Sequence, residues 1–240
     1  MFSRESDMIA PLTESLPGLL VPEGPYAVAC EVPDGSRVVD IMYASLPHAK
    51  ANMSDLVPFA ERLSRLSVAQ TMVLALVWRE GRLSTQRLSA MTYLRPDRLE
   101  DEYLRPFERS GLVLRDRRSW TVGAWGEARP AQLVAVEAKL TNWREALAQA
   151  DDNRSRADLS YIALPEVDAG RKRAEIRRSA MQLGVGVVEL NSQGDASIVV
   201  KAKRSPAHVC RQKWQLSVRL LADALRADGR WVVCDQAAGA

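Results

Sequence analysis

"LVAVEAKLTNWREALAQADDNRSRADLSYIAL", from Leu133 to Leu164, is the segment from which the expected fold follows. It begins with an apolar strand, continues as an amphipathic helix and ends in a second apolar strand. Downstream, a charged helix and the strands "VGVVELN" and "SIVVKAKRS" continue the alternation. Strands and helices in this order predict an α/β (α+β) fold, a mixed β-sheet with helices on its faces.

Two charged residues, Glu137 and Lys139, stand inside the first of these strands. Side chains two positions apart in a strand share a face, so both point one way while Val136 and Ala138 pack on the other side. Burying a charge without a partner is costly. The chain therefore keeps these two residues either as a structural ion pair at a strand end or for a chemical purpose.

A further acid, Asp40, occupies an apolar strand earlier in the chain. The segment "YAVACEVPDGSRVVDIMYASL" (Tyr26 to Leu46) is typical of two strands joined by a tight turn at "PDGS". In the second strand, Val39 and Ile41 face one side and Asp40 faces the other. If this strand pairs beside the strand that begins the first segment, two carboxylates and an ammonium converge.

That set of groups suits the hydrolysis of a phosphodiester bond. Carboxylates bind Mg²⁺ or Mn²⁺ through oxygen, and the ion lowers the pKa of an attacking water and stabilises charge on a phosphate. A lysine holds the water or steadies the phosphate. The chemistry needs neither histidine nor cysteine.

The words "VVDIMYA" (Val38 to Ala44) and "VAVEAKL" (Val134 to Leu140) resemble the motifs of the PD-(D/E)xK nuclease superfamily. The resemblance implies a restriction-endonuclease-like mixed sheet flanked by helices. It makes Asp40 and Glu137 ligands of Mg²⁺ or Mn²⁺ and Lys139 the catalytic lysine.

Three further residues are assigned through the same resemblance. Gln149 matches the glutamine of a Gln-x-x-x-Tyr element that lies near the substrate, although Asn153 stands where tyrosine would be. An additional acid is expected at the metal, either Glu14 in an early helix or Glu31 in the first strand.

A different pattern separates the two motifs. Residues 54–126 read as three helices followed by a basic hairpin, with "FERSGLVLRD" (Phe107 to Asp116) between them, and this order resembles a winged helix-turn-helix. The expected helices begin at Ser67, Ser84 and Pro96, and Pro106 must kink or split the third. We expect this insertion to interrupt a discontinuous nuclease-like domain formed by residues 1–53 and 127–240.

Such a module usually contacts DNA, and its arginines carry that expectation. The candidate nucleic-acid contacts are Arg98 in the third helix and Arg115, Arg117 and Arg118 around the hairpin turn. Three successive acids at 100–102 oppose contact through the helix, so a role in protein–protein or dimer contact is the alternative.

Bulk composition narrows the class of protein. The chain of 240 residues is 47% hydrophobic and 26% charged, which is typical of a globular protein, and no apolar run approaches the length of a membrane helix. Its basic residues are 27 arginines and 6 lysines, and arginine suits phosphate contact. With 3 cysteines far apart and 2 histidines, a zinc site or a histidine-activated nucleophile is not expected, and each cysteine is interpreted as a small buried residue.

The combined expectation is a cytoplasmic, Mg²⁺-dependent (or Mn²⁺-dependent) DNA endonuclease whose partner is DNA and not a membrane. The first alternative is a catalytically inactive DNA-binding or regulatory protein on the same fold, and the second is a protein-interaction scaffold. A final amphipathic helix from Pro206 to Gly229 packs on the body of the protein or, as the second choice, forms a homodimer.

Overall fold

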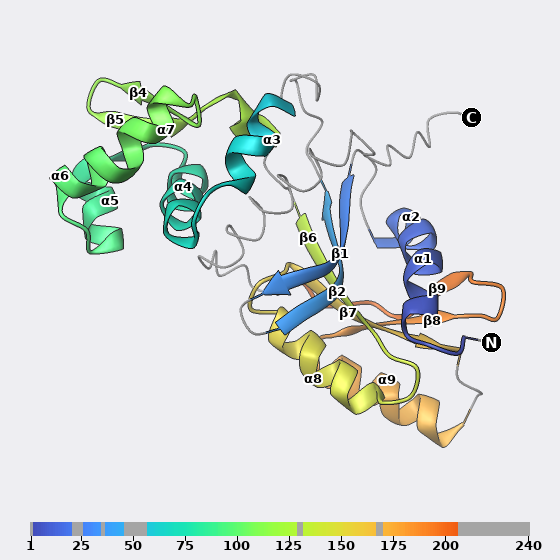
Figure 1. Cartoon of the computed structure of the whole chain (residues 1–240). Helices are drawn as coiled ribbons and strands as arrows, with labels where there is room; N and C mark the ends of the chain where they lie inside the picture. Colours follow the sequence, from blue (N-terminus) through green and yellow to red (C-terminus); the bar gives the residue numbers. More distant parts are fainter. Residues whose placement is uncertain are drawn as a thin grey trace, which may run out of the picture. The chain divides into compact units, whose positions relative to one another are not determined.

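The computed structural model describes residues 2–20, 26–34, 37–45, 57–128, 132–166 and 170–205. They fall into two compact units (Figure 1). The first unit contains the described residues up to Ser45 and from Gln132 onward, and the second contains residues 57–128. The expected last helix, Pro206 to Gly229, lies outside the described residues.

The first unit is built on a six-stranded mixed sheet, as the alternation of strands and helices predicts. Its strands, in the spatial order β1-β2-β6-β7-β8-β9, are β1 (Tyr26–Asp34), β2 (Arg37–Ser45), β6 (Gln132–Ala138), β7 (Leu159–Pro165), β8 (Gly186–Leu190) and β9 (Ala196–Val200). β6, β7 and β8 are parallel, and every other neighbouring pair is antiparallel. The parallel strands are joined by helical crossovers, as such pairs require.

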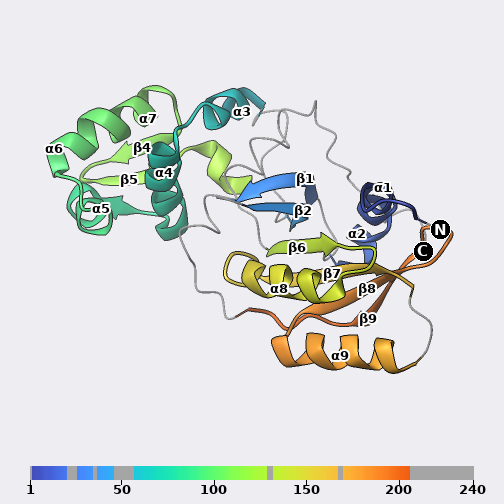
Figure 2. The same ribbon diagram turned by 60° about the horizontal axis from the view of Figure 1, so that its bottom comes forward.

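Helices cover both faces of this sheet. The helices are α1 (Ser6–Ser15), α2 (Pro17–Leu20), α8 (Trp143–Asn153) and α9 (Arg171–Leu183). Figures 1 and 2 show α8 and α9 on one face and α1 on the other. In the core, Leu12 of α1 packs with Ile41 and Val136, whereas Ala146 of α8 packs with Ile162 on the opposite face. The alternation of side chains along each strand therefore separates two apolar layers.

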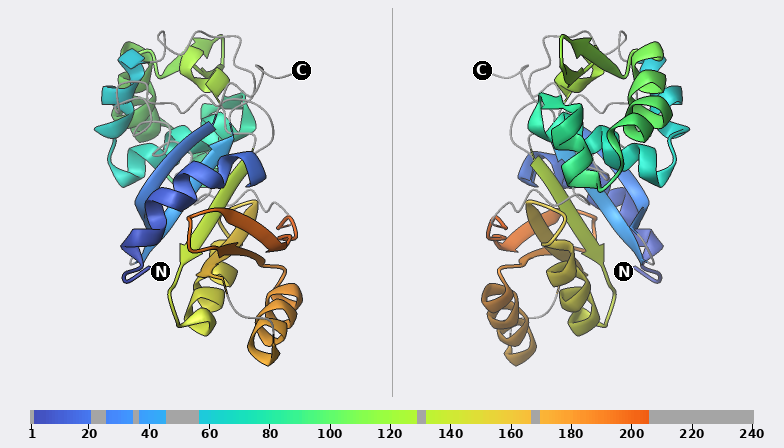
Figure 3. Two further views of the ribbon diagram at one scale, coloured as in Figure 1. Left: turned by 90° about the vertical axis from the view of Figure 1, so that its right-hand side faces the viewer. Right: turned by 90° about the vertical axis from the view of Figure 1, so that its left-hand side faces the viewer.

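The second unit contains helices and a three-stranded sheet with the order β3-β5-β4. Its elements are α3 (Val57–Ser64), α4 (Val68–Glu80), β3 (Leu83–Ser84), α5 (Thr85–Thr92), α6 (Pro96–Leu99), a π-helical segment (Glu100–Leu104), α7 (Arg105–Arg109), β4 (Val113–Asp116), β5 (Ser119–Val122) and a 3₁₀ segment (Ala124–Ala128). Trp78 and Trp125 pack with their ring centroids 4.8 Å apart and are fully buried. Figure 3 shows this unit from two opposite sides.

The helix starts expected in this unit are confirmed by their caps. The Ser67 side chain accepts a hydrogen bond from the Gln70 backbone N–H, and the Gln70 side-chain oxygen accepts one from the Ser67 backbone N–H, which forms a capping box. The Ser84 side chain caps α5 by accepting a hydrogen bond from the Arg87 backbone N–H. Pro106 has no N–H to donate, and the helix is π-helical directly before it, so the expected irregularity is present.

The early helix expected around Glu14 is present as α1, in which Met8 and Leu12 lie one turn apart and both pack on the sheet. Two other expectations need correction. Cys30 is exposed in β1, so it is not the small buried residue that its hydrophobic character indicated. Arg115 lies within β4 rather than in the basic turn, which leaves Arg117 and Arg118 at the turn itself.

In the part of the chain that the structure describes, no helix combines the length and apolar character needed to cross a membrane.

Candidate functional site

The candidate site lies where β2 and β6 run side by side. Their antiparallel pairing extends from Ser45 opposite Gln132 to Ile41 opposite Val136. At the next position Asp40 accepts a hydrogen bond on Oδ2 from the backbone N–H of Ala138, at 2.8 Å. The pairing and this bond hold the Asp40 carboxylate beside Glu137.

Glu137 is a buried acid, only 3% exposed, that faces away from the α1 layer. Burial raises its pKa, and the negative charge of Asp40 and a hydrogen bond between the two carboxyls raise it further, to about 7. The hydrogen bond from Asn153 Nδ2 to Glu137 Oε1, 2.6 Å long, and the charge of Lys139 act in the opposite direction. Around neutral pH Glu137 is therefore partly protonated.

Asp40 shows the same crowding of negative charge. Burial raises its pKa above the ordinary value, and the charge of Glu5 raises it too. The N–H of Ala138, the ammonium of Lys139 and the bond to Glu137 lower it, without cancelling the effect of burial.

Lys139 directly follows β6 and donates a hydrogen bond from Nζ to Oε2 of Glu5, at 3.1 Å. Burial lowers the pKa of Lys139, but the bond to Glu5 and the charges of Glu5, Asp40 and Glu145 raise it above its ordinary value. The side chain is therefore a fixed cation beside the two carboxyls. Glu5 directly precedes α1, so the first helix closes this part of the site.

Helix α8 contributes one stripe of side chains to the site. Glu145, Gln149 and Asn153 are spaced four residues apart and so share a face. The charge of Glu145 raises the pKa of Lys139, and Asn153 donates a hydrogen bond to Glu137. Between them, Oε1 of Gln149 is buried and has no hydrogen-bond partner among the described residues. An acceptor of this kind normally has a donor, so Gln149 has capacity to bind a water or ligand.

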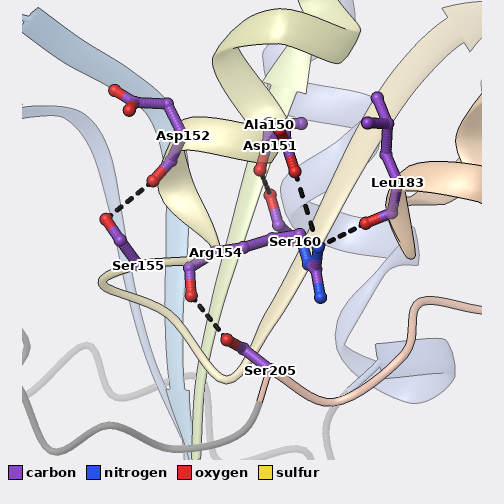
Figure 4. A network of polar contacts seen from close by, with 8 residues as sticks. All are labelled: Ala150, Asp151, Asp152, Arg154, Ser155, Ser160, Leu183 and Ser205. Atoms are coloured by element: carbon purple, nitrogen blue, oxygen red, sulfur yellow. Dashed lines mark hydrogen bonds and ion pairs between the residues drawn. The ribbon is translucent and has the colours of Figure 1, made fainter.

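The end of α8 that carries Asn153 is anchored by polar contacts (Figure 4). Arg154 donates to the carbonyl oxygen of Leu183 and approaches Asp151 at 3.5 Å, while Ser205 Oγ donates to the Arg154 carbonyl at 2.7 Å. Ser160 Oγ of β7 donates to the carbonyl of Ala150 at 2.6 Å. These bonds fix the helix end against β7 and α9, and with it the donor to Glu137.

The other acids assigned by resemblance are both exposed. Glu31 lies in β1 with a left-handed φ of 51°, between the register pairs Cys30–Ile41 and Val32–Val39 that flank Asp40. Glu14 is exposed in α1, nine residues after Glu5, which corresponds to about 13 Å along a helix. Among the described residues, no group of three or more acidic, histidine or cysteine side chains has the arrangement of a metal site.

The expected nucleic-acid contacts all lie in the second unit. Arg98 is engaged by Glu102 at 2.8 Å on the same helix. Arg115 lies over the ring of Trp120, 5.2 Å from its centroid. Arg117, with a φ of 55°, and the exposed Arg118 form the hairpin turn. The turn therefore presents two cations, whereas the helix neutralises its own arginine.

The sequence reasoning missed two residues that touch the candidate site. Glu5 lies 134 positions from Lys139 in the chain, and no local pattern around it signals a contact. Asn153 carried a signal, because it falls four residues after Gln149 on the same helix face, but its pattern did not show that it would donate to Glu137.

Comparisons with protein-family profiles, with curated proteins and with solved structures gave no match. The geometry of the site is therefore the basis for the functional argument.

Proposed function

We propose that this protein is a metal-dependent deoxyribonuclease of the PD-(D/E)xK type, which hydrolyses phosphodiester bonds in DNA. The observation that carries the proposal is the meeting of the Asp40 and Glu137 carboxyls, from adjacent strands, with the Lys139 ammonium beside them. A buried ion pair alone accounts poorly for this arrangement, because Lys139 is bonded to Glu5 and the negative charge of Asp40 raises the pKa of the buried Glu137.

The donor set fits a divalent cation. Mg²⁺ needs only one or two protein carboxylates, since water and substrate phosphate complete its coordination, and Asp40 and Glu137 supply two. Burial raises the pKa of both acids, the charge of Asp40 raises that of Glu137 further and the charge of Glu5 raises that of Asp40, so a cation between the two acids would offset these effects. When bound, the ion supplies charge for the phosphate and lowers the pKa of an attacking water.

The remaining side chains have separate roles in this proposal. Lys139 holds the water or the phosphate oxygens by hydrogen bonding and charge. Glu5 positions Lys139 and keeps it protonated, and Asn153 orients Glu137. Gln149 offers its free carbonyl oxygen to a donor group of the substrate.

We further propose that the second unit is a winged helix, inserted into a restriction-endonuclease-like domain, that positions the DNA. The order α4, β3, α5, α6 to α7, β4, β5 supports this interpretation, as does a hairpin turn that presents Arg117 and Arg118. The ion pairs of Arg98 and Arg105 with acids of their own helix favour contact through the hairpin rather than through the helix.

The test is cleavage of plasmid and single-stranded DNA by the purified protein with Mg²⁺ or Mn²⁺. Cleavage is expected for the wild type and for Glu14→Gln, an exposed acid of α1, and is expected to be lost in Asp40→Ala and Lys139→Ala. If neither metal supports cleavage in the wild type, the alternative of a regulatory DNA-binding protein takes its place. In that case DNA binding should fall in the Arg117→Ala/Arg118→Ala variant and persist in Lys139→Ala.

A further inference from the structure

A cleft with a volume of about 280 Å³ lies between α9 and the edge strand β9 of the first unit. Its lining residues are Arg177, Met181, Gly184, Val199, Val200, Lys201 and Lys203. Three of them are cations and none is an acid. Within the described residues, no hydrogen bond or ion pair engages the side chains of those three cations.

A fourth cation borders the cleft. A Cβ placed on Gly184 would lie 3.2 Å from Nη2 of Arg154 and 3.4 Å from Cβ of Lys203, so both side chains lie against this glycine. Gly184 has a left-handed φ of 72°, which a side chain would strain. A concave surface lined by charges of one sign concentrates the electrostatic potential and attracts counter-ions.

The apolar part of the lining defines the ligand more closely. Met181 is 59% exposed, and Val199 and Val200 line the same cleft. A free inorganic anion would use the cations and leave this apolar surface in water. A nucleotide unit presents both chemistries, because it carries a phosphate beside a sugar and a base.

The cleft lies close enough to the candidate site for one nucleic-acid strand to contact both. The sheet register aligns Glu137 with Ile162, Ile162 with Val187 and Val187 with Val200. Glu137 and Val200 are therefore three inter-strand spacings apart, which is about 14 Å. Asn153 contacts the candidate site, and the next residue, Arg154, contacts Leu183 beside the cleft.

We propose that Arg177, Lys201 and Lys203 form a second nucleic-acid contact, which binds the phosphate backbone of a strand through charge while Met181 contacts a sugar or base. The further statement, that the strand bound here is the one bound at the candidate site, rests on the proposed function. The phosphate contact itself does not, because it needs neither metal nor cleavage.

The experiment measures binding of a fluorescein-labelled 20-nucleotide single strand by anisotropy in EDTA, over a range of salt concentrations. The test variant is Arg177→Gln/Lys201→Gln/Lys203→Gln. The matched control is Arg171→Gln/Lys172→Gln/Arg178→Gln, which removes three exposed cations of the same helix that do not line the cleft. Circular dichroism checks that both variants fold.

The test variant should bind at least about tenfold more weakly than the control, and the slope of log K against log salt should fall by about 2, the value for three lost phosphate contacts on a single strand. Equal affinities and slopes for the two variants would overturn the proposal. Binding of inorganic phosphate or a mononucleotide at the cleft without binding of the 20-mer would also overturn it, in favour of a small-anion site.

Lysine acetylation followed by mass spectrometry locates the contact directly, because the chain has only 6 lysines. The 20-mer should protect Lys201 and Lys203 at least about threefold more than Lys172 in the wild type, as expected where phosphate binding excludes the reagent. Equal labelling with and without DNA would contradict the proposal. Protection that persists in Asp40→Asn, in a protein that does not cleave DNA, would separate this site from the nuclease proposal and leave it standing.

Discussion

Glu137→Gln should stabilise the first unit at pH 8 and leave its stability unchanged at pH 4.5. Glutamine has the shape of the protonated acid, since it can accept the bond from Asn153 Nδ2 and donate to Asp40. The substitution therefore removes the negative charge of Glu137 while retaining its contacts.

The size of the effect follows from the raised pKa. The native protein holds the proton of Glu137 up to about pH 7, whereas an unfolded chain releases it near 4.5. Between these pH values the native state binds more protons, so the free energy of unfolding falls as pH rises. The shift corresponds to about 3 kcal/mol, which is fully lost above pH 7 and which Glu137→Gln should restore.

Amide hydrogen exchange of β2 and β6 measures this difference in the first unit alone. Wild type and variant are compared at the same pH in EDTA, so the intrinsic pH dependence of exchange cancels. Protection should be about a hundredfold greater in the variant at pH 8, since 1.4 kcal/mol corresponds to a factor of ten.

Glu189→Gln is the matched control. Glu189 is a buried acid of β8 that accepts a 3.0 Å hydrogen bond from Nε of Arg173, so its charge has a partner. Removing this charge should lower protection at pH 8, the opposite sign from Glu137→Gln. The reasoning would be refuted if the protection of Glu137→Gln relative to the wild type were the same at pH 4.5 and at pH 8.

Three other predictions concern the metal, the orienting residue and the second unit. Mg²⁺ or Mn²⁺ should raise the melting temperature more at pH 8 than at pH 5.5, because protons compete with the metal for Glu137. A rise of the same size in Asp40→Asn would contradict a metal site at Asp40 and Glu137. Asn153→Ala should destabilise the protein by about 1–3 kcal/mol at pH 8, since the buried Glu137 carboxylate loses its donor. Hydrogen exchange of β6 measures this loss, and unchanged exchange would show that the bond from Asn153 to Glu137 does not contribute to stability. Ser67→Ala should cost about 1 kcal/mol through loss of the capping box, seen as faster exchange in α4 but not in β6.

The segment from Leu133 to Leu164 shows how far the sequence predicts the fold. Its strand, helix and strand appear as β6, α8 and β7, because the apolar period changes from two to that of a helix and back. Local caps and turns, such as Ser67, Ser84 and Pro106, were predictable for the same reason: their chemistry acts on neighbouring residues. Helix α1 was expected only through the family resemblance and not from its own pattern, since its apolar stripe is short and its partners include Tyr43, 31 residues after Leu12.

Alternation along one chain was enough to predict that Glu137 and Asp40 each lie in an apolar strand, on the face opposite to that of their apolar neighbours. The pairing of β2 with β6, the bond of Lys139 to Glu5 and the bond of Asn153 to Glu137 could be known only from the folded protein. Contacts between residues distant in sequence depend on how whole elements pack, and the raised pKa of Glu137 arises from that packing.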